Sequence, residues 1–157
     1  MHNSGTKVRR PTRNSAYLTV HTARCLLACL ASNTPVPELP YPMYTAAMKG
    51  MIVTSISGLD KAEKEKFKQL VERMAGIYSN AFHDGVTHLV AATARSQKYE
   101  VAVGKEIPCM LPRWVAEVWK VSSNELVTAV DPRFSSHRCP ALLGATVSFS
   151  QLNRADK

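Results

Sequence analysis

The chain has 157 residues, a hydrophobic content of 45% and a formal net charge of +8. This length is typical of one domain, and this hydrophobic content suffices to bury a core. No apolar run approaches the roughly 20 residues of a membrane-spanning helix, so we expect no membrane partner. Most of the excess positive charge lies in the first fifty residues. This segment contains one acidic residue, Glu38, and these basic residues: Lys7, Arg9, Arg10, Arg13, Arg24 and Lys49. A nucleic-acid footprint spread over the whole domain is therefore not required.

The N-terminal third is predicted to lie outside the folded domain. We expect residues 1–33 to form a basic, disordered leader, although their arginine-containing, acid-poor composition also resembles a mitochondrial transit peptide. Four prolines within residues 34–47 forbid a regular helix and favour an extended linker. Because this linker separates the leader from every expected strand and helix, the leader should be dispensable for folding.

The cysteines predict neither disulfides nor a metal site. The chain contains no CxxC pair, and its thiols are typical of a reducing compartment: Cys25, Cys29, Cys109 and Cys139. His21, Cys25 and Cys29 are spaced four apart, but no fourth ligand is evident for a structural zinc ion. We therefore predict no metal and no cofactor.

The first predicted elements are a buried strand and an amphipathic helix. Residues 51–56 are apolar on both faces and lie between Gly50 and Gly58, as in a central parallel strand. Asp60 with Glu63 forms a capping box, followed by apolar residues at helical spacing: Phe67, Leu70, Val71 and Met74. Gly76 is predicted to close this helix.

Shorter elements follow in alternation. We predict strands at residues 77–78, 87–91 and 107–111, a helix capped by Ser96, and a helix that begins at Pro112. The order is β-α-β-β-α-β-α. It predicts an α/β fold in which three helices flank a small, mostly parallel, four-stranded sheet.

Two loops of this sheet predict an anion pocket. Ser57 and Gly58 follow the first strand and precede the first helix, while Lys98 lies at the start of the second helix. Ligands collect at the carboxyl ends of parallel strands, and helix N-termini attract anions. By contrast, no serine, cysteine and histidine set has the spacing of a nucleophile with its base, and no glycine-rich nucleotide loop is present. We expect no enzymatic activity and no small-molecule substrate; His88 and Trp114 are predicted to be structural.

Several motifs resemble the BRCT family over about half of the chain: Ser57-Gly58-Leu59, Met74-Ala75-Gly76, Val86-Thr87-His88-Leu89-Val90, Lys98-Tyr99 and Leu111-Pro112-Arg113-Trp114-Val115. Within the family, the resemblance is to scaffold proteins of replication and checkpoint signalling that bind topoisomerase II. It implies a BRCT domain at residues 48–122, a linker at 123–138 and the incomplete start of a second repeat at 139–157.

The resemblance also implies a phosphate site. In the family, a small hydroxyl residue, the next backbone N–H and a lysine hold phosphoserine or phosphothreonine, and these positions fall on Ser57, Gly58 and Lys98. A further cation, usually arginine, falls on Lys64, and lysine lacks the bidentate fork of arginine. Taken alone, Ser57 is a turn residue and Lys98 a solvated helix start; the register with the family favours phosphate binding.

The function implied is a nuclear, phosphopeptide-binding scaffold module of replication initiation and DNA-damage checkpoint signalling. Its partners would be phosphorylated protein tails, such as those of a checkpoint clamp or of replication-initiation factors. Direct binding of DNA ends or backbone, helped by the basic leader, is an alternative. A purely structural packing repeat is another.

Overall fold

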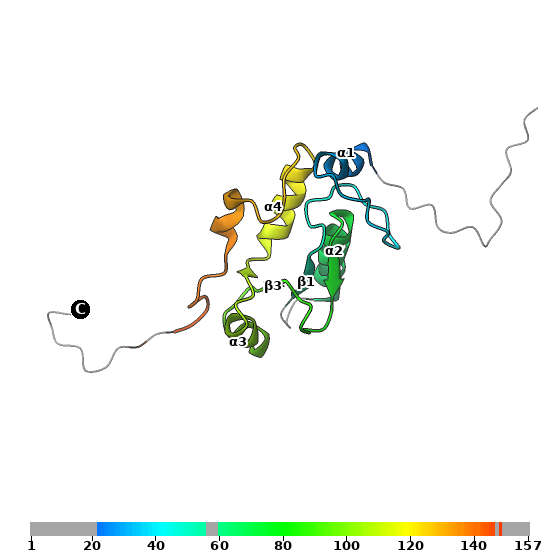
Figure 1. The fold of residues 1–157 in the computed structure, drawn as a ribbon. Helices are drawn as coiled ribbons and strands as arrows, with labels where there is room; N and C mark the ends of the chain where they lie inside the picture. Colours follow the sequence, from blue (N-terminus) through cyan, green and yellow to red (C-terminus); the bar gives the residue numbers. More distant parts are fainter. Residues whose placement is uncertain (1–21, 56–59, 147, 149–157) are drawn as a thin grey trace, which may run out of the picture.

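A computed structural model describes residues 22–55, 60–146 and 148 (Figure 1). Its helices and strands, in chain order, are α1 (Ala23–Ala31), β1 (Ile52–Ser55), α2 (Lys61–Arg73), β2 (Ile77–Ser79), β3 (His88–Val90), α3 (Gln97–Gly104), β4 (Cys109–Met110), α4 (Arg113–Ser122) and the 3-10 helix η1 (Pro132–His137). The predicted β-α-β-β-α-β-α order is confirmed from β1 to α4.

The strands form one parallel sheet in the order β2-β1-β3-β4. Strand β1 is central, and Val53 pairs with Tyr78 on one side and with His88 on the other. Because both faces of β1 are covered, Val53 and Thr54 are each fully buried. The predicted fold class is confirmed.

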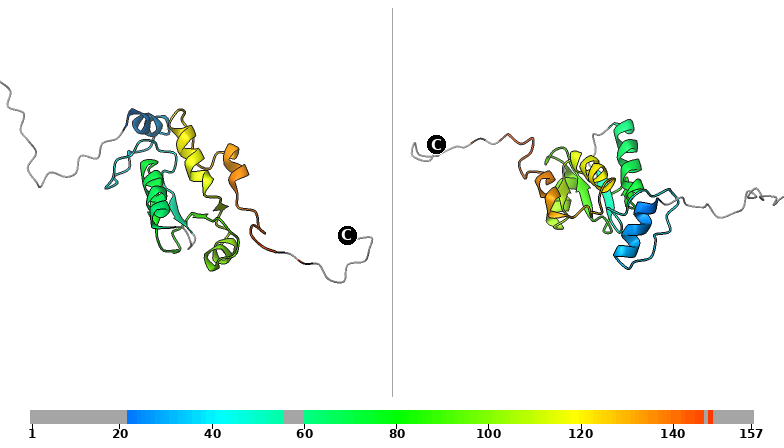
Figure 2. Two further views of the ribbon diagram at one scale, coloured as in Figure 1. Left: turned by 180° about the vertical axis from the view of Figure 1, so that it is seen from behind. Right: turned by 90° about the horizontal axis from the view of Figure 1, so that it is seen from above.

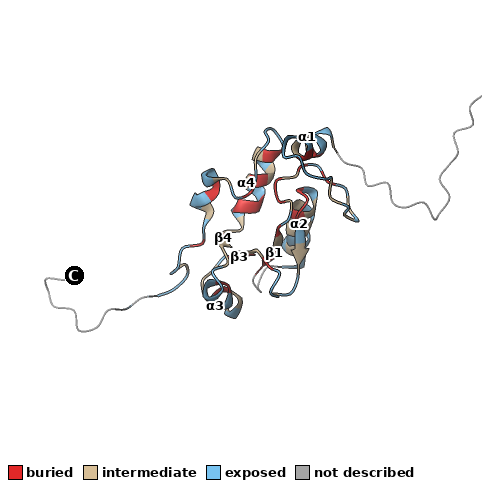
Figure 3. Ribbon diagram, viewed as in Figure 1, coloured by how far each residue is buried: buried red, intermediate tan, exposed pale blue. Residues whose placement is uncertain are grey.

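Helices cover both faces of the sheet. Helices α2 and α4 bury Val71 and Trp114 against Val53, and the inner side of α4 is buried along its length (Figure 3). Helix α3 packs on the opposite face, where Tyr99 and Ala102 contact a separate apolar cluster around Leu89. Helices α1 and α3 lie at opposite ends of the domain in Figure 1 and in the view from behind (Figure 2, left).

The predicted caps begin the helices as expected. The Glu63 N–H donates to the Asp60 carboxylate at 2.7 Å, and the Asp60 N–H donates back to Glu63 at 3.2 Å, which completes the capping box of α2. The Tyr99 N–H donates to the Ser96 hydroxyl at 3.2 Å. These local bonds satisfy N–H groups that lack partners within the helix.

The end of α2 differs in one detail from the prediction. The residue in the left-handed region after this helix is Ala75, with φ of 63°, rather than Gly76. Gly76 is required for close packing instead, because a Cβ there would lie 2.9 Å from Val71 Cγ1 and 3.0 Å from Met48 Cβ.

The predicted disordered leader is wrong for residues 23–31, which form α1. Thr22 caps this helix, and Cys25 and Cys29 are buried. Cys25 packs with Met43 and Ala75 in a small apolar cluster. The leader folds because the proline-rich segment turns back and brings Met43 against it, a contact that local composition does not reveal. Residues 1–21 lie outside the described part of the chain.

The proline-rich segment is therefore not an extended spacer. Met43 and Thr45 are buried, and the N–H groups of Tyr44 and Thr45 both donate to the carbonyl of Arg73, at 2.8 and 3.1 Å. Prolines exclude a helix here, but they leave the neighbouring N–H groups free to bind α2. The expected start of the domain at residue 48 is thus too late.

The segment after α4 also belongs to the folded domain. Ala129 and Phe134 are buried in the main core, and the Ala129 N–H donates to the Ala47 carbonyl at 2.8 Å. The expected linker at 123–138 is wrong in this respect. A second repeat beginning in 139–157 stays a prediction: residues 147 and 149–157 lie outside the described chain, and Cys139 and Leu143 pack on this domain.

Two further expectations concern membranes and metals. In the ranges that the structure describes, no helix is long and apolar enough to cross a membrane. The same ranges hold no group of three or more histidine, cysteine, aspartate or glutamate side chains that could bind a metal ion. His21, the third residue of the spacing with Cys25 and Cys29, lies outside them.

Candidate anion-binding site

One residue of the predicted site, Lys98, lies at the carboxyl end of β1. Lys98, in the first turn of α3, donates from Nζ to the carbonyl of Ser55 at 2.9 Å and to the carbonyl of Asn80 at 3.2 Å. Ser55 is itself fixed, because its hydroxyl lies 2.7 Å from the Tyr78 hydroxyl. The Lys98 ammonium is thereby held at the last residue of β1.

A second cation lies close to Lys98. Burial lowers the pKa of Lys98 below its usual value, and the positive charge of Lys64 lowers this pKa further. Both side chains are half-buried. Among the described residues, no carboxylate pairs with either lysine. An anion bound between them would relieve the repulsion that lowers this pKa.

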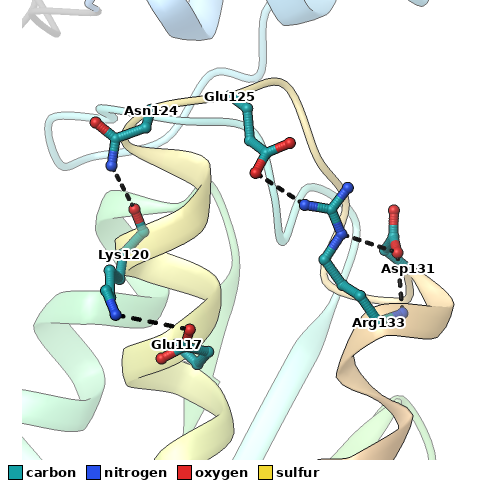
Figure 4. A network of polar contacts seen from close by, with 6 residues as sticks. All are labelled: Glu117, Lys120, Asn124, Glu125, Asp131 and Arg133. Atoms are coloured by element: carbon teal, nitrogen blue, oxygen red, sulfur yellow. Dashed lines mark hydrogen bonds and ion pairs between the residues drawn. The ribbon is translucent and has the colours of Figure 1, made fainter.

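Three other cations of the described chain are paired with acids. Figure 4 shows Arg133 between Glu125 at 2.8 Å and Asp131 at 3.2 Å, an arrangement that ties the loop after α4 to η1. Lys105 pairs with Asp84, and Lys120 lies 4.0 Å from Glu117. The lysine pair differs from these, since it combines two like charges with partial burial.

Lys64 is near enough to Lys98 for its charge to act on the Lys98 ammonium, and the phosphate-binding roles of both lysines stay predictions. Ser57 and Gly58 lie outside the described residues, so their roles stay predictions. One part of the expectation changes: Asp60 and Ser96 already accept N–H groups of the first turns of α2 and α3. The lysines, more than free helix N–H groups, therefore supply the positive potential of this site.

The residues that anchor Lys98 were not predicted from the sequence. Ser55 and Asn80 contribute backbone carbonyls, which every residue type carries, so no sequence signal could have singled them out. A cavity of about 390 Å³ also adjoins Lys98 along α3, with Phe82, Val101 and the Lys105–Asp84 ion pair in its lining.

His88 and Trp114 are structural in this fold. Their rings stack with centroids 5.3 Å apart, and Trp114 Nε1 donates to the Ala129 carbonyl at 3.3 Å. Burial, with a smaller contribution from the charge of Arg138, lowers the pKa of His88 to about 4. The imidazole is thus neutral at physiological pH and forms part of the core.

Comparison with known proteins relates this chain to curated proteins of much greater length. Protein ECT2 of Homo sapiens is 27% identical over 133 residues, which are 84% of this chain and 15% of that protein. Protein ECT2 of Mus musculus is 26% identical over 153 residues, 92% of this chain and 17% of that protein. The chain thus spans about a sixth of these relatives.

The fold is shared with a solved structure, the crystal structure of Rad4 BRCT1,2 in complex with a Crb2 phosphopeptide. The TM-score is 0.53 at 22% identity, over 62% of this chain and 54% of that one. A family profile described as the twin BRCT domain matches residues 52–114, from β1 to the start of α4. With the sheet order and this match in agreement, the domain has the BRCT fold.

Proposed function

We propose that this BRCT domain binds a phosphorylated serine or threonine of a partner protein. The observation that supports it is the pair of half-buried cations, Lys64 and Lys98, at the carboxyl end of β1. A phosphate dianion carries enough charge to interact with both lysines and three oxygens to accept their hydrogen bonds. An unmodified serine has neither, so phosphorylation would control binding.

Each residue has a distinct role in this proposal. Lys98, fixed by the carbonyls of Ser55 and Asn80, supplies the main charge. Lys64 supplies a second, more flexible contact from α2. The Ser57 hydroxyl and the Gly58 N–H would donate to the remaining phosphate oxygens. Catalysis is not part of this proposed role.

Residues of the partner beside the phosphate would lie along the cavity next to Lys98. Phe82 and Val101 offer it apolar surface, and the Lys105–Asp84 pair offers polar contacts. The domain would serve as a scaffold module, in the nucleus and in the response to DNA damage or in replication checkpoint signalling. The phosphopeptide complex of Rad4 is a precedent within the BRCT fold.

The test begins with a phosphoserine and phosphothreonine peptide library, offered alongside the same library after phosphatase treatment. We expect retention of the phosphorylated peptides only. Equal retention of both would overturn the proposal, and binding of a short DNA duplex with a steep salt dependence would replace it with DNA recognition.

Isothermal titration calorimetry with one retained peptide then tests whether Lys98 binds the phosphate. Lys98→Glu removes the cation and adds repulsion, which should cost about 2–5 kcal/mol, or roughly 30-fold or more in affinity. Lys120→Glu is the matched control, since it makes the same charge change on the exposed surface of α4. Unchanged affinity in a folded Lys98→Glu protein would contradict the site assignment.

A further inference from the structure

Residues 137–139 cover the outer edge of the sheet. Met110 of β4 forms an antiparallel bridge with Arg138. The Leu111 N–H donates to the His137 carbonyl at 2.7 Å, and the Cys139 N–H donates to the Cys109 carbonyl at 2.8 Å. These two bonds flank the bridge, so the residues on either side of it also face each other. Cys109 therefore lies directly opposite Cys139.

Both thiols belong to the same cluster on the α3 face of the sheet. Cys139 is 9% exposed and Cys109 is half-buried, and both pack near Leu89 and Tyr99. Burial first, and the neighbouring Cys139 second, raise the pKa of Cys109 to about 11. Burial first, and then the same two cysteines, raise the pKa of Tyr99. Both cysteines thus lie in one cluster on the same face of the sheet, and both are reduced.

The backbone geometry suits a covalent bridge. Opposed residues of an antiparallel pair have Cα atoms about 4.5–5.5 Å apart, within the roughly 4.4–6.8 Å that disulfides span. Cys25 and Cys29 offer an internal contrast, since they lie four apart on one helix. Their Cβ atoms are then about 5–6 Å apart, more than the roughly 3.5–4.5 Å of a disulfide, and the helix cannot close the difference.

We propose that Cys109 and Cys139 form a redox modification site, in which a disulfide oxidant such as glutathione disulfide links the two sulfur atoms. One thiolate attacks glutathione disulfide, forms a mixed disulfide and releases a first glutathione. The second thiolate then attacks the mixed disulfide and releases a second glutathione. Both cysteines are oxidised, glutathione disulfide is reduced to two thiols, and the two cysteine protons end on these thiols.

The bridge would fix the path of the chain after η1. In the reduced protein, a few backbone bonds hold this segment, among them the bond from Cys139 to Cys109 and one from Ala94 N–H to the Leu143 carbonyl at 3.0 Å. A disulfide would close the loop that contains α4 and η1, which restricts the unfolded chain and stabilises the folded one.

The experiment uses the full chain at pH 8 in glutathione buffers of increasing oxidant ratio. After equilibration, free thiols are alkylated and the protein is digested with trypsin. The expected product is the peptide of residues 106–113 linked to that of residues 139–154, two hydrogens lighter than their sum. The melting temperature of the oxidised protein should rise by roughly 5–15 °C.

Matched variants separate this pair from the other thiols. Cys109→Ser and Cys139→Ser should each abolish the linked peptide and the rise in melting temperature, whereas Cys25→Ser should keep both. The yield of the Cys109–Cys139 linkage in the urea-unfolded chain, oxidised in the same buffers, is the reference. The folded chain should give at least tenfold more of this linkage. An equal or smaller yield in the folded chain, or glutathione adducts on Cys139 without linkage, would overturn the proposal.

Discussion

Two cations of helix α2, Lys64 in its first turn and Arg73 in its last, have opposite surroundings. Arg73, in the last turn, lies over the rings of Tyr44 and Trp119, 5.6 and 6.0 Å from their centroids. Lys64, in the first turn, lies near enough to Lys98 to lower its pKa, and it pairs with no carboxylate among the described residues. The helix dipole favours Arg73 and disfavours Lys64.

This difference extends to the two ends of the sheet. At the amino end, where the strands begin, α1, the proline-rich segment and the aromatic rings around Arg73 fill the space beside α2. At the carboxyl end, two cations remain without a negative partner in the described chain. Interactions at the amino end therefore serve stability, and those at the carboxyl end are available to a ligand. Four predictions test this division, from the largest expected effect to the smallest.

Removal of residues 1–33 should destabilise the domain by about 3–5 kcal/mol, because it exposes Met43 and removes the buried side chains of Cys25 and Cys29. Urea unfolding followed by circular dichroism measures the change. Removal of residues 1–21 alone is the control, since it breaks none of the described contacts. If both truncated proteins were equally stable, α1 would not be part of the folded domain.

Acid should destabilise the domain through His88. Its pKa is about 4 in the folded chain and about 6.5 when unfolded, so the unfolded state binds more protons between these values. The contribution is complete above pH 6.5 and is lost as the pH falls toward 4, by up to about 3 kcal/mol. Stability measured across this window should fall less steeply in His88→Gln. Parallel profiles for the two proteins would show that His88 is solvated.

Gly76→Ala should destabilise the domain by about 1–3 kcal/mol, the usual cost of an added methyl group in a packed core. The new Cβ would collide with Val71 and with the Met48 Cβ at the amino end of the sheet. Thermal unfolding measures the loss. Gly104→Ala is a suitable control, because a Cβ there meets nothing within 4 Å. Similar melting temperatures for both variants would mean that this packing is loose.

The smallest effects are expected for Lys64 and Arg73 of α2, one on binding and the other on stability. Lys64→Ala should weaken phosphopeptide binding by about 1 kcal/mol and leave the melting temperature unchanged, because it removes a flexible ligand contact. Arg73→Ala should lower stability by a similar amount through lost cation–π contacts and leave the affinity unchanged. Titration calorimetry measures the affinity of each variant for the phosphopeptide, and thermal unfolding measures its melting temperature. An exchange of the two effects would reverse the division between the ends of the sheet.

The sequence by itself determined the elements that depend on local signals. Periodicity predicted α2, the capping box at Asp60 and the Ser96 cap fixed the starts of α2 and α3, and the alternation of strands with helices predicted a parallel sheet. It also identified Lys64 and Lys98 as candidate ligands, because their positions follow from these elements and from the family resemblance.

Only the tertiary structure decided which distant segments complete the domain. The packing of α1 on Met43, the cover of β4 by residues 137–139 and the approach of Lys64 to Lys98 each join parts of the chain far apart in sequence. Local propensity carries no information about such contacts, because their free energy arises from burial and pairing that exist only after the chain has folded.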